Sequence, residues 1–111
     1  MWAVVPRGDA RPVGTVLLVV MPDGSGAPTG DVEVGWHFHP DHWGKGYATE
    51  AARGAVQHGF AAGLSEVYAV VRPDNAPSLA VCRRLGMEHL GRTDRYYGVS
   101  LETFRLTRPS A

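Results

Sequence analysis

Apolar residues along the first forty positions form three short runs, and each run predicts a β-strand. Residues 2–5 are apolar and residues 12–21 are rich in Val and Leu, with a Gly8-Asp9 turn signal between them. We expect these two strands to pair antiparallel. A loop over residues 21–29 contains Pro22-Asp23-Gly24, a sequence typical of turns. The third strand is expected over residues 31–39, and Pro40 ends it because proline cannot donate to a strand ladder.

The third run alternates along its length, which assigns its side chains to two faces of a sheet. One face carries Val32, Val34, Trp36 and Phe38. The other face carries Glu33, Gly35, His37 and His39. The run therefore predicts a strand with one apolar face and one face that carries titratable groups.

The residues after position 46 change to helical spacing. Small and apolar side chains recur at Ala48, Ala52, Ala55, Val56, Gly59 and Phe60. Gly63 suits the end of this helix. Residues 65–72 then form a run dense enough in apolar residues to predict a strand buried on both faces.

A second helix is expected to begin near Asn75 or Pro77, because asparagine and proline both suit a helix start. Its apolar line is Leu79, Cys82 and Leu85. Residues 87–106 predict two strands with an irregular middle over residues 91–98. The order β-β-β-α-β-α-β-β predicts a mixed α/β fold in which helices follow central strands, as a single domain over residues 1–111.

Charge and cysteine content narrow the function classes. Eleven basic and eleven acidic residues give a formal net charge of zero, which argues against a nucleic-acid partner and against an anionic membrane surface. A single cysteine forms no internal disulfide, and the longest apolar stretch is too short to span a bilayer. The composition predicts a cytoplasmic protein, and it indicates no metal site.

The junction between the third strand and the first helix carries the main chemical signal. Gly44 and Gly46 directly precede the helix, so that successive backbone N–H groups and the helix N-terminus can converge on a phosphate. Lys45 adds a positive charge. The same loop is equally consistent with a tight strand-to-helix turn that binds nothing. The Walker and full Gly-x-Gly-x-x-Gly patterns are both absent, since Thr49 replaces the third glycine.

Three segments together resemble a known family. Residues 40–51 resemble a motif whose core is Arg/Gln-x-x-Gly-x-Gly/Ala: Gly46 and Ala48 match, whereas Trp43 stands where Arg or Gln is usual. Residues 75–87 resemble a second motif, Asn-x-x-Ser/Ala with a closing Leu-Gly-Phe/Met, and residues 32–36 resemble a Glu-Ile-Gly-Tyr strand. These are motifs of the GNAT-superfamily N-acetyltransferases, and the branch that acetylates ribosomal-protein N-termini and aminoglycosides is the most similar.

The resemblance implies acetyl-CoA as cosubstrate, held between two splayed strands at residues 32–39 and 66–72. The diphosphate would lie on backbone N–H groups of Trp43, Gly44, Lys45, Gly46, Tyr47 and Ala48. The pantetheine arm would pair with the strand backbone near His37, Phe38 and His39, and Asn75 would bind pantetheine or a water. Asn75 and Ser78 are also ordinary helix-capping residues.

For the reaction, the resemblance implies direct attack of a primary amine on the thioester. Glu33 is the candidate base, with His37 and His39 as candidate relays on the same strand face; a solvated structural role is the alternative for all three. Ser78 is the candidate proton donor to the thiolate, because Cys82 stands where relatives place a tyrosine and is expected to pack in the core.

Relatives carry a strand and two helices before the segment that matches residue 2, and those elements form much of the acceptor wall. We therefore expect an N-terminally truncated fold, with three explanations open: a misplaced start codon, a fragment, or a short protein completed by a partner subunit such as a second copy in a homodimer. The acceptor is expected to be a small-molecule or peptide amine. A non-catalytic acyl-CoA-binding or protein-interaction module is the rival interpretation.

Overall fold

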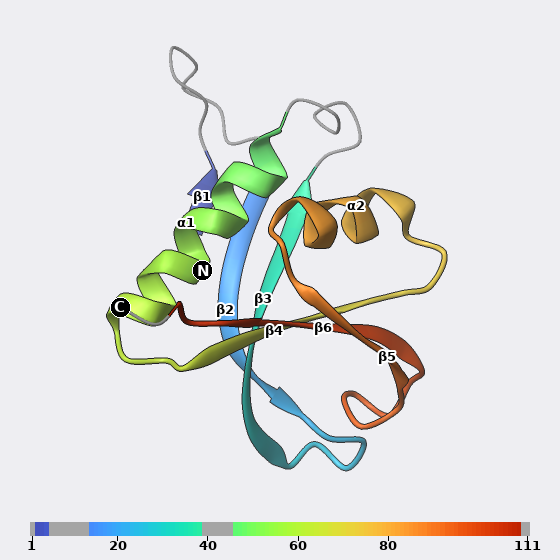
Figure 1. The fold of residues 1–111 in the computed structure, drawn as a ribbon. Helices are drawn as coiled ribbons and strands as arrows, with labels where there is room; N and C mark the ends of the chain where they lie inside the picture. The colour runs from blue at the N-terminus through green and yellow to red at the C-terminus, as the bar shows by residue number, and fades with distance from the viewer. Residues whose placement is uncertain (1, 5–13, 39–45, 110–111) are drawn as a thin grey trace.

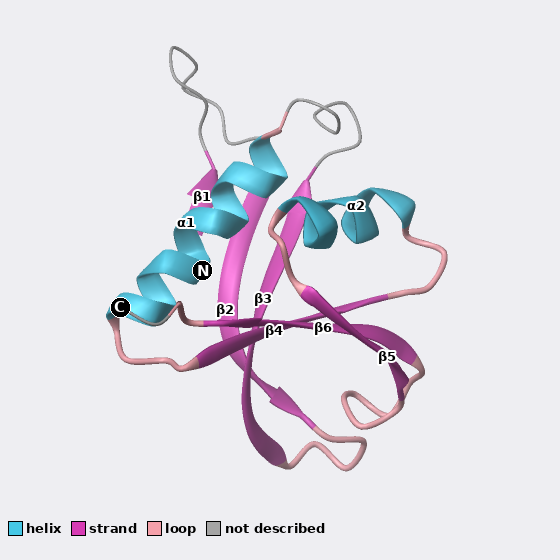
Figure 2. Ribbon diagram, viewed as in Figure 1, coloured by secondary structure: helices cyan, strands magenta, loops and turns pink. Residues whose placement is uncertain are grey.

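The computed structural model describes residues 2–4, 14–38 and 46–109, and within them the chain forms strands and helices in the predicted order (Figures 1 and 2). The strands are β1 (Trp2–Val4), β2 (Gly14–Pro22), β3 (Pro28–Phe38), β4 (Glu66–Val71), β5 (Glu88–Thr93) and β6 (Leu101–Thr107). The helices are α1 (Tyr47–Ala61) and α2 (Ala76–Arg84).

The strands form one six-stranded sheet in the order β1-β2-β3-β4-β6-β5. Every neighbouring pair is antiparallel except β3 and β4, which run parallel and are joined through α1. The two parallel strands pair at one register position only, Glu33 with Tyr68. Beyond this point they diverge, as Figure 1 shows where β4 turns away from β3. The mixed, mostly antiparallel α/β fold predicted from the sequence is confirmed.

Both helices pack on one face of the sheet, where the main core lies. Ala52 and Val56 of α1 and Cys82 of α2 meet Val34 of β3 and Val67 of β4, all of them nearly inaccessible to solvent. The predicted apolar face of β3 is part of this cluster, because Trp36 and Phe38 pack against it. Cys82 is fully buried, as expected for a small core residue.

The opposite face of the sheet carries a smaller cluster of Met21, Tyr68 and Tyr96. Tyr96 belongs to the connection between β5 and β6, so this connection crosses the sheet face that the helices leave uncovered. The same face carries Glu33, which alternates with the core residue Val34 along β3. The helix-free face is therefore the one that carries titratable groups.

The turn between β2 and β3 is shorter than the sequence suggests. The predicted loop covers residues 21–29, but β2 continues to Pro22 and β3 starts at Pro28. The carboxylate of Asp23 explains the difference, because it accepts hydrogen bonds from the backbone N–H groups of Ser25 (2.8 Å) and Ala27 (3.1 Å). Across the described ranges, no helix is both long and apolar enough to cross a membrane.

Candidate active site

A cleft opens where β3 and β4 diverge. It has a volume of about 590 Å³, and its walls come from β3, the end of β4, the start of α2 and the β5–β6 connection. Glu33, His37, Asn75 and Ser78, four residues singled out from the sequence, all line it. The structure therefore brings together candidates that lie up to 45 positions apart (33 to 78) in the chain.

Glu33 is the acidic group of the cleft, and it is 9% exposed. Burial raises the pKa of its carboxyl above the usual range, because the charged form loses hydration. The hydroxyl of Tyr97 donates a hydrogen bond to Glu33 Oε1, which acts in the opposite direction. A carboxylate with a raised pKa at the wall of a cleft has the properties of a general base.

Ser78 lies in the first turn of α2 and is held by two hydrogen bonds. Its backbone N–H donates to Asn75 Oδ1 at 3.2 Å, so Asn75 is the N-cap of the helix. Its hydroxyl accepts from Trp36 Nε1 at 3.1 Å. Because the hydroxyl acts as an acceptor toward Trp36, its own proton is available to another partner. Ser78 is buried in the protein, yet it forms part of the cleft wall.

The N-terminus of α1 lies at the end of the sheet where β3 ends (Figure 1). Gly46 is its N-cap with φ of 78°, a left-handed conformation that favours glycine, and no side chain among the described residues caps the helix. Tyr47 is half-buried and Ala48 is buried. Thr49 is 8% exposed, and its hydroxyl has no hydrogen-bond partner among the described residues. Within the described ranges, this helix start therefore has no side-chain cap and carries one buried hydroxyl without a hydrogen-bond partner.

The remaining sequence candidates are divided between the described and the undescribed parts of the chain. His37 is exposed and lines the cleft, whereas Phe38 packs against the core cluster. His39, Trp43, Gly44 and Lys45 lie outside the described residues. In the part of the chain that is described, no three His, Cys, Asp or Glu side chains gather as they would around a metal ion.

Sequence reasoning missed three residues of this region. Tyr97 contacts Glu33, and Trp36 contacts Ser78. Both contacts join residues far apart in the sequence, so no local sequence pattern predicts either of them. Thr49 could have been recognised, because it is a polar residue directly beside Ala48, on the side of the helix wheel that also carries Ala52.

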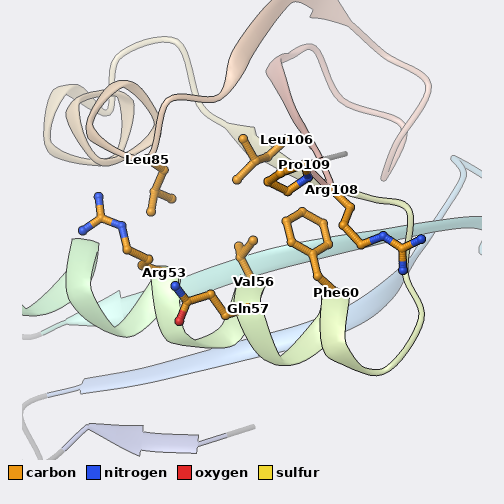
Figure 3. Close-up of a pocket in the computed structure, with 8 residues that line it drawn as sticks. All are labelled: Arg53, Val56, Gln57, Phe60, Leu85, Leu106, Arg108 and Pro109. Carbon is orange, nitrogen blue, oxygen red and sulfur yellow. The ribbon is translucent and has the colours of Figure 1, made fainter. Parts of the chain in front are cut away.

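A second cavity, of about 350 Å³, lies between α1 and the C-terminal end of β6 (Figure 3). Phe60, Leu85 and Leu106 form its apolar walls, with Arg53 and Arg108 at its sides. None of the described residues that line it is Asp, Glu, His, Ser or Cys. It offers no group for acid–base or nucleophilic chemistry, so the cleft between β3 and β4 is the better candidate for an active site.

Comparison with known proteins gives one family. The family model described as "Acetyltransferase (GNAT) domain" matches residues 1–88. An uncharacterized N-acetyltransferase of Bacillus subtilis (strain 168), YnaD, is 40% identical over 60 residues, which make up 53% of this chain and 35% of that protein. The chain thus matches only about a third of this relative's length.

Solved structures share the fold. A GNAT-family acetyltransferase from Bacillus anthracis superposes with a TM-score of 0.76 at 24% identity, covering 95% of this chain and 64% of that one. The aminoglycoside acetyltransferase AAC(6')-Ib, solved in complex with coenzyme A, gives a TM-score of 0.73 at 17% identity and covers 88% and 61% of the two chains.

Proposed function

The chain belongs to the GNAT acetyltransferase family, and from this premise we propose that the protein transfers an acetyl group from acetyl-CoA to a primary amine. The observation that carries the proposal is the cleft between β3 and β4, which joins a buried carboxylate, Glu33, to a positioned hydroxyl, Ser78. The acceptor would be the amine of a small molecule or a peptide. A homodimer is compatible with the exposed Val19 and Val20 on β2, and the mass in solution tests it.

The start of α1 is the proposed diphosphate site. Backbone N–H groups at a helix N-terminus attract anions, and no side chain of the described residues caps this helix. The hydroxyl of Thr49 has no partner among the described residues, and this supports the proposal independently, because a buried hydroxyl without a partner is costly unless a ligand pairs with it. AAC(6')-Ib, which has the same fold, was solved with coenzyme A bound.

The chemistry proposed for the cleft needs one base and one acid. An amine of ordinary pKa, about 10 for a lysine-like group, arrives protonated and must lose a proton before it attacks. Glu33 accepts that proton. The amine nitrogen then bonds to the acetyl carbonyl carbon and the carbon–sulfur bond breaks. The nitrogen gives up its second proton, which passes through the Ser78 hydroxyl to the departing thiolate, so that Ser78 ends as a neutral hydroxyl. Trp36 positions Ser78 for this step through the 3.1 Å hydrogen bond from its indole nitrogen.

The test begins with binding. We expect coenzyme A and acetyl-CoA to bind the full-length protein in isothermal titration calorimetry, and thiol release to follow when an amine panel is added. Gly46→Glu places a charge at the proposed phosphate site, and Gly46→Gln is the neutral control of the same size. Both variants share the strain of φ 78°, and a Cβ there meets no atom of the described residues within 4 Å, so their difference isolates charge.

The size of that difference follows from Coulomb's law. For unit charges about 6 Å apart at an effective dielectric of about 20–40, repulsion is about 1.4–2.8 kcal/mol, which corresponds to about 10- to 100-fold weaker binding. Equal affinities for Gly46→Glu and Gly46→Gln would refute the phosphate site. Binding of coenzyme A by the full-length protein without turnover of any amine would instead identify a non-catalytic acyl-CoA-binding module.

A further inference from the structure

The connection between β5 and β6 is fastened to the turn between β2 and β3. The backbone N–H of Tyr97 donates to the carbonyl of Pro22 at 3.0 Å. Gly98 and Gly24 meet backbone to backbone: a Cβ on either would lie 3.1 Å from the Cα of the other. Two loops that are far apart in the sequence are therefore held together at a contact that is tight even for a Cβ atom.

Tyr96 anchors the same connection in the sheet. It is 3% exposed, and its hydroxyl donates to Asp31 Oδ2 at 2.7 Å. The guanidinium of Arg95 pairs with the same oxygen at 3.2 Å and lies over the Tyr96 ring at 5.3 Å. Burial, a hydrogen bond and an ion pair thus fix the position of the residue directly before Tyr97.

Tyr97 adopts φ of 59°, and it is the one non-glycine residue with a positive φ in the described ranges. The left-handed region is disfavoured for a side chain of this size, so surrounding contacts must hold the residue there. In this conformation its hydroxyl donates to Glu33 Oε1. Two consecutive tyrosines thus reach two carboxylates spaced two residues apart on β3, Asp31 and Glu33.

We propose that Tyr97 is a positioning residue of the acetyl-transfer site, which holds the Glu33 carboxyl group in one orientation and favours its ionised form. The inference rests on the proposed function. An ionised carboxylate accepts through both of its oxygens. With Oε1 occupied by Tyr97, Oε2 is the oxygen left to take the proton of the amine. Tyr97 also lines the cleft that holds Glu33, and it is 41% exposed, so the pair lies where an acceptor would enter.

Other titratable or charged groups surround Glu33. Tyr68 stands opposite it in β4, and Asp31 lies two residues before it on β3. His37 and Arg72 line the same cleft. The side-chain hydrogen bond to Glu33 comes from none of these four groups but from Tyr97. That bond favours the charged carboxylate against the effect of burial. The proposed role therefore predicts that loss of the Tyr97 hydroxyl changes the pH at which Glu33 is protonated.

The test compares Tyr97→Phe with Tyr96→Phe in the full-length protein. Each variant loses one tyrosine hydroxyl, but only the first hydroxyl contacts Glu33. The first readout is the NMR titration of the Glu33 side-chain carboxyl. The second is the pH profile of kcat/KM, with the KM for acetyl-CoA as the internal control. Glu33→Gln identifies the carboxyl resonance.

We expect the Glu33 titration midpoint in Tyr97→Phe to rise by about one pH unit, the tenfold change in proton affinity that one lost hydrogen bond can cause. The acid limb of the kcat/KM profile moves with it, and the KM for acetyl-CoA stays unchanged. An unshifted midpoint, or an equal shift in Tyr96→Phe, would overturn the inference. No turnover by the wild type with any amine would count against the proposed function instead, and the NMR titration still reports whether Tyr97 controls Glu33.

Discussion

Thr49→Val is predicted to change stability and coenzyme A binding in opposite directions. Thr49 is the third residue of α1, it is 8% exposed, and its Oγ1 has no partner within the described part of the chain. A buried hydroxyl without a hydrogen bond costs about 1–3 kcal/mol. Valine has nearly the same shape and helix propensity without that hydroxyl. In the absence of ligand, we therefore expect the free energy of unfolding to rise by about 1 kcal/mol or more.

If the hydroxyl of Thr49 pairs with a phosphate oxygen, coenzyme A should bind the wild type more tightly than Thr49→Val and so stabilise the wild type more. A hydrogen bond to a charged group contributes about 1.5–3 kcal/mol, so the affinity of Thr49→Val for coenzyme A should fall by about 10- to 100-fold. Urea unfolding with and without coenzyme A measures the stability change, and calorimetry measures affinity. Thr103→Val is the matched control: it is 4% exposed, but its hydroxyl has an acceptor, the Leu101 carbonyl at 3.5 Å.

The control variant Thr103→Val should have a slightly lower free energy of unfolding than the wild type and the same affinity for coenzyme A. If Thr49→Val were instead less stable than the wild type and bound coenzyme A equally well, its hydroxyl would have a protein partner in solution. The argument that places phosphate at the start of α1 would then fail.

Three further predictions follow from buried or strained groups. Burial raises the pKa of Glu33 above 4.5 and outweighs the opposing hydrogen bond from Tyr97, so ionising Glu33 costs the folded protein more than the unfolded chain. The stability from Glu33 is therefore full below about pH 4.5 and is lost as pH rises through the raised pKa. Glu33→Gln should exceed the wild type in free energy of unfolding by urea at pH 7 and match it near pH 4. Burial raises the pKa of Cys82 to about 12, so a thiol reagent should label it only after unfolding, as mass spectrometry would show. Gly98→Ala combines a left-handed φ of 72° with a Cβ 3.1 Å from the Cα of Gly24, whereas Gly91→Ala shares the strain (φ 100°) without a close atom. We expect urea unfolding to show about 1–2 kcal/mol lost in Gly91→Ala and more in Gly98→Ala, and equal losses would contradict the packing argument.

The fold could be predicted because its signals are local. The buried residues of α1 recur at the helical period, and Asn75 caps α2 as its position suggested. β4 is buried along most of its length, as its apolar density indicated. The turn before β3 was predicted too long, because the sequence pattern does not reveal that Asp23 organises a compact turn through its side chain.

The site could be predicted only in part, because its contacts join distant segments. Glu33 was found from alternation along β3, and Ser78 from its place in a motif. Their partners, Tyr97 and Trp36, lie 64 and 42 residues away, respectively. Alternation assigned Trp36 to the core face, which is correct for its ring but says nothing about its indole N–H. Tyr97 sits in a connection that the sequence shows only as irregular.

The divergence of β3 and β4 explains why one strand can serve both the core and the cleft. One face of β3 packs in the core cluster beside the helices through Val34, Trp36 and Phe38. The strand therefore does not depend on β4 for its position. Among the described residues, β3 and β4 pair only at Glu33 and Tyr68, so β4 does not pair with this edge of β3 over residues 34–37. Backbone N–H and C=O groups along such an edge need a hydrogen-bonding partner, and an extended ligand can supply it in the way an added strand would. On the proposed function, the pantetheine arm of acetyl-CoA is that partner. A sheet that closed fully would be more regular, but it would leave neither the space nor the backbone donors that the proposed acyl transfer beside Glu33 requires.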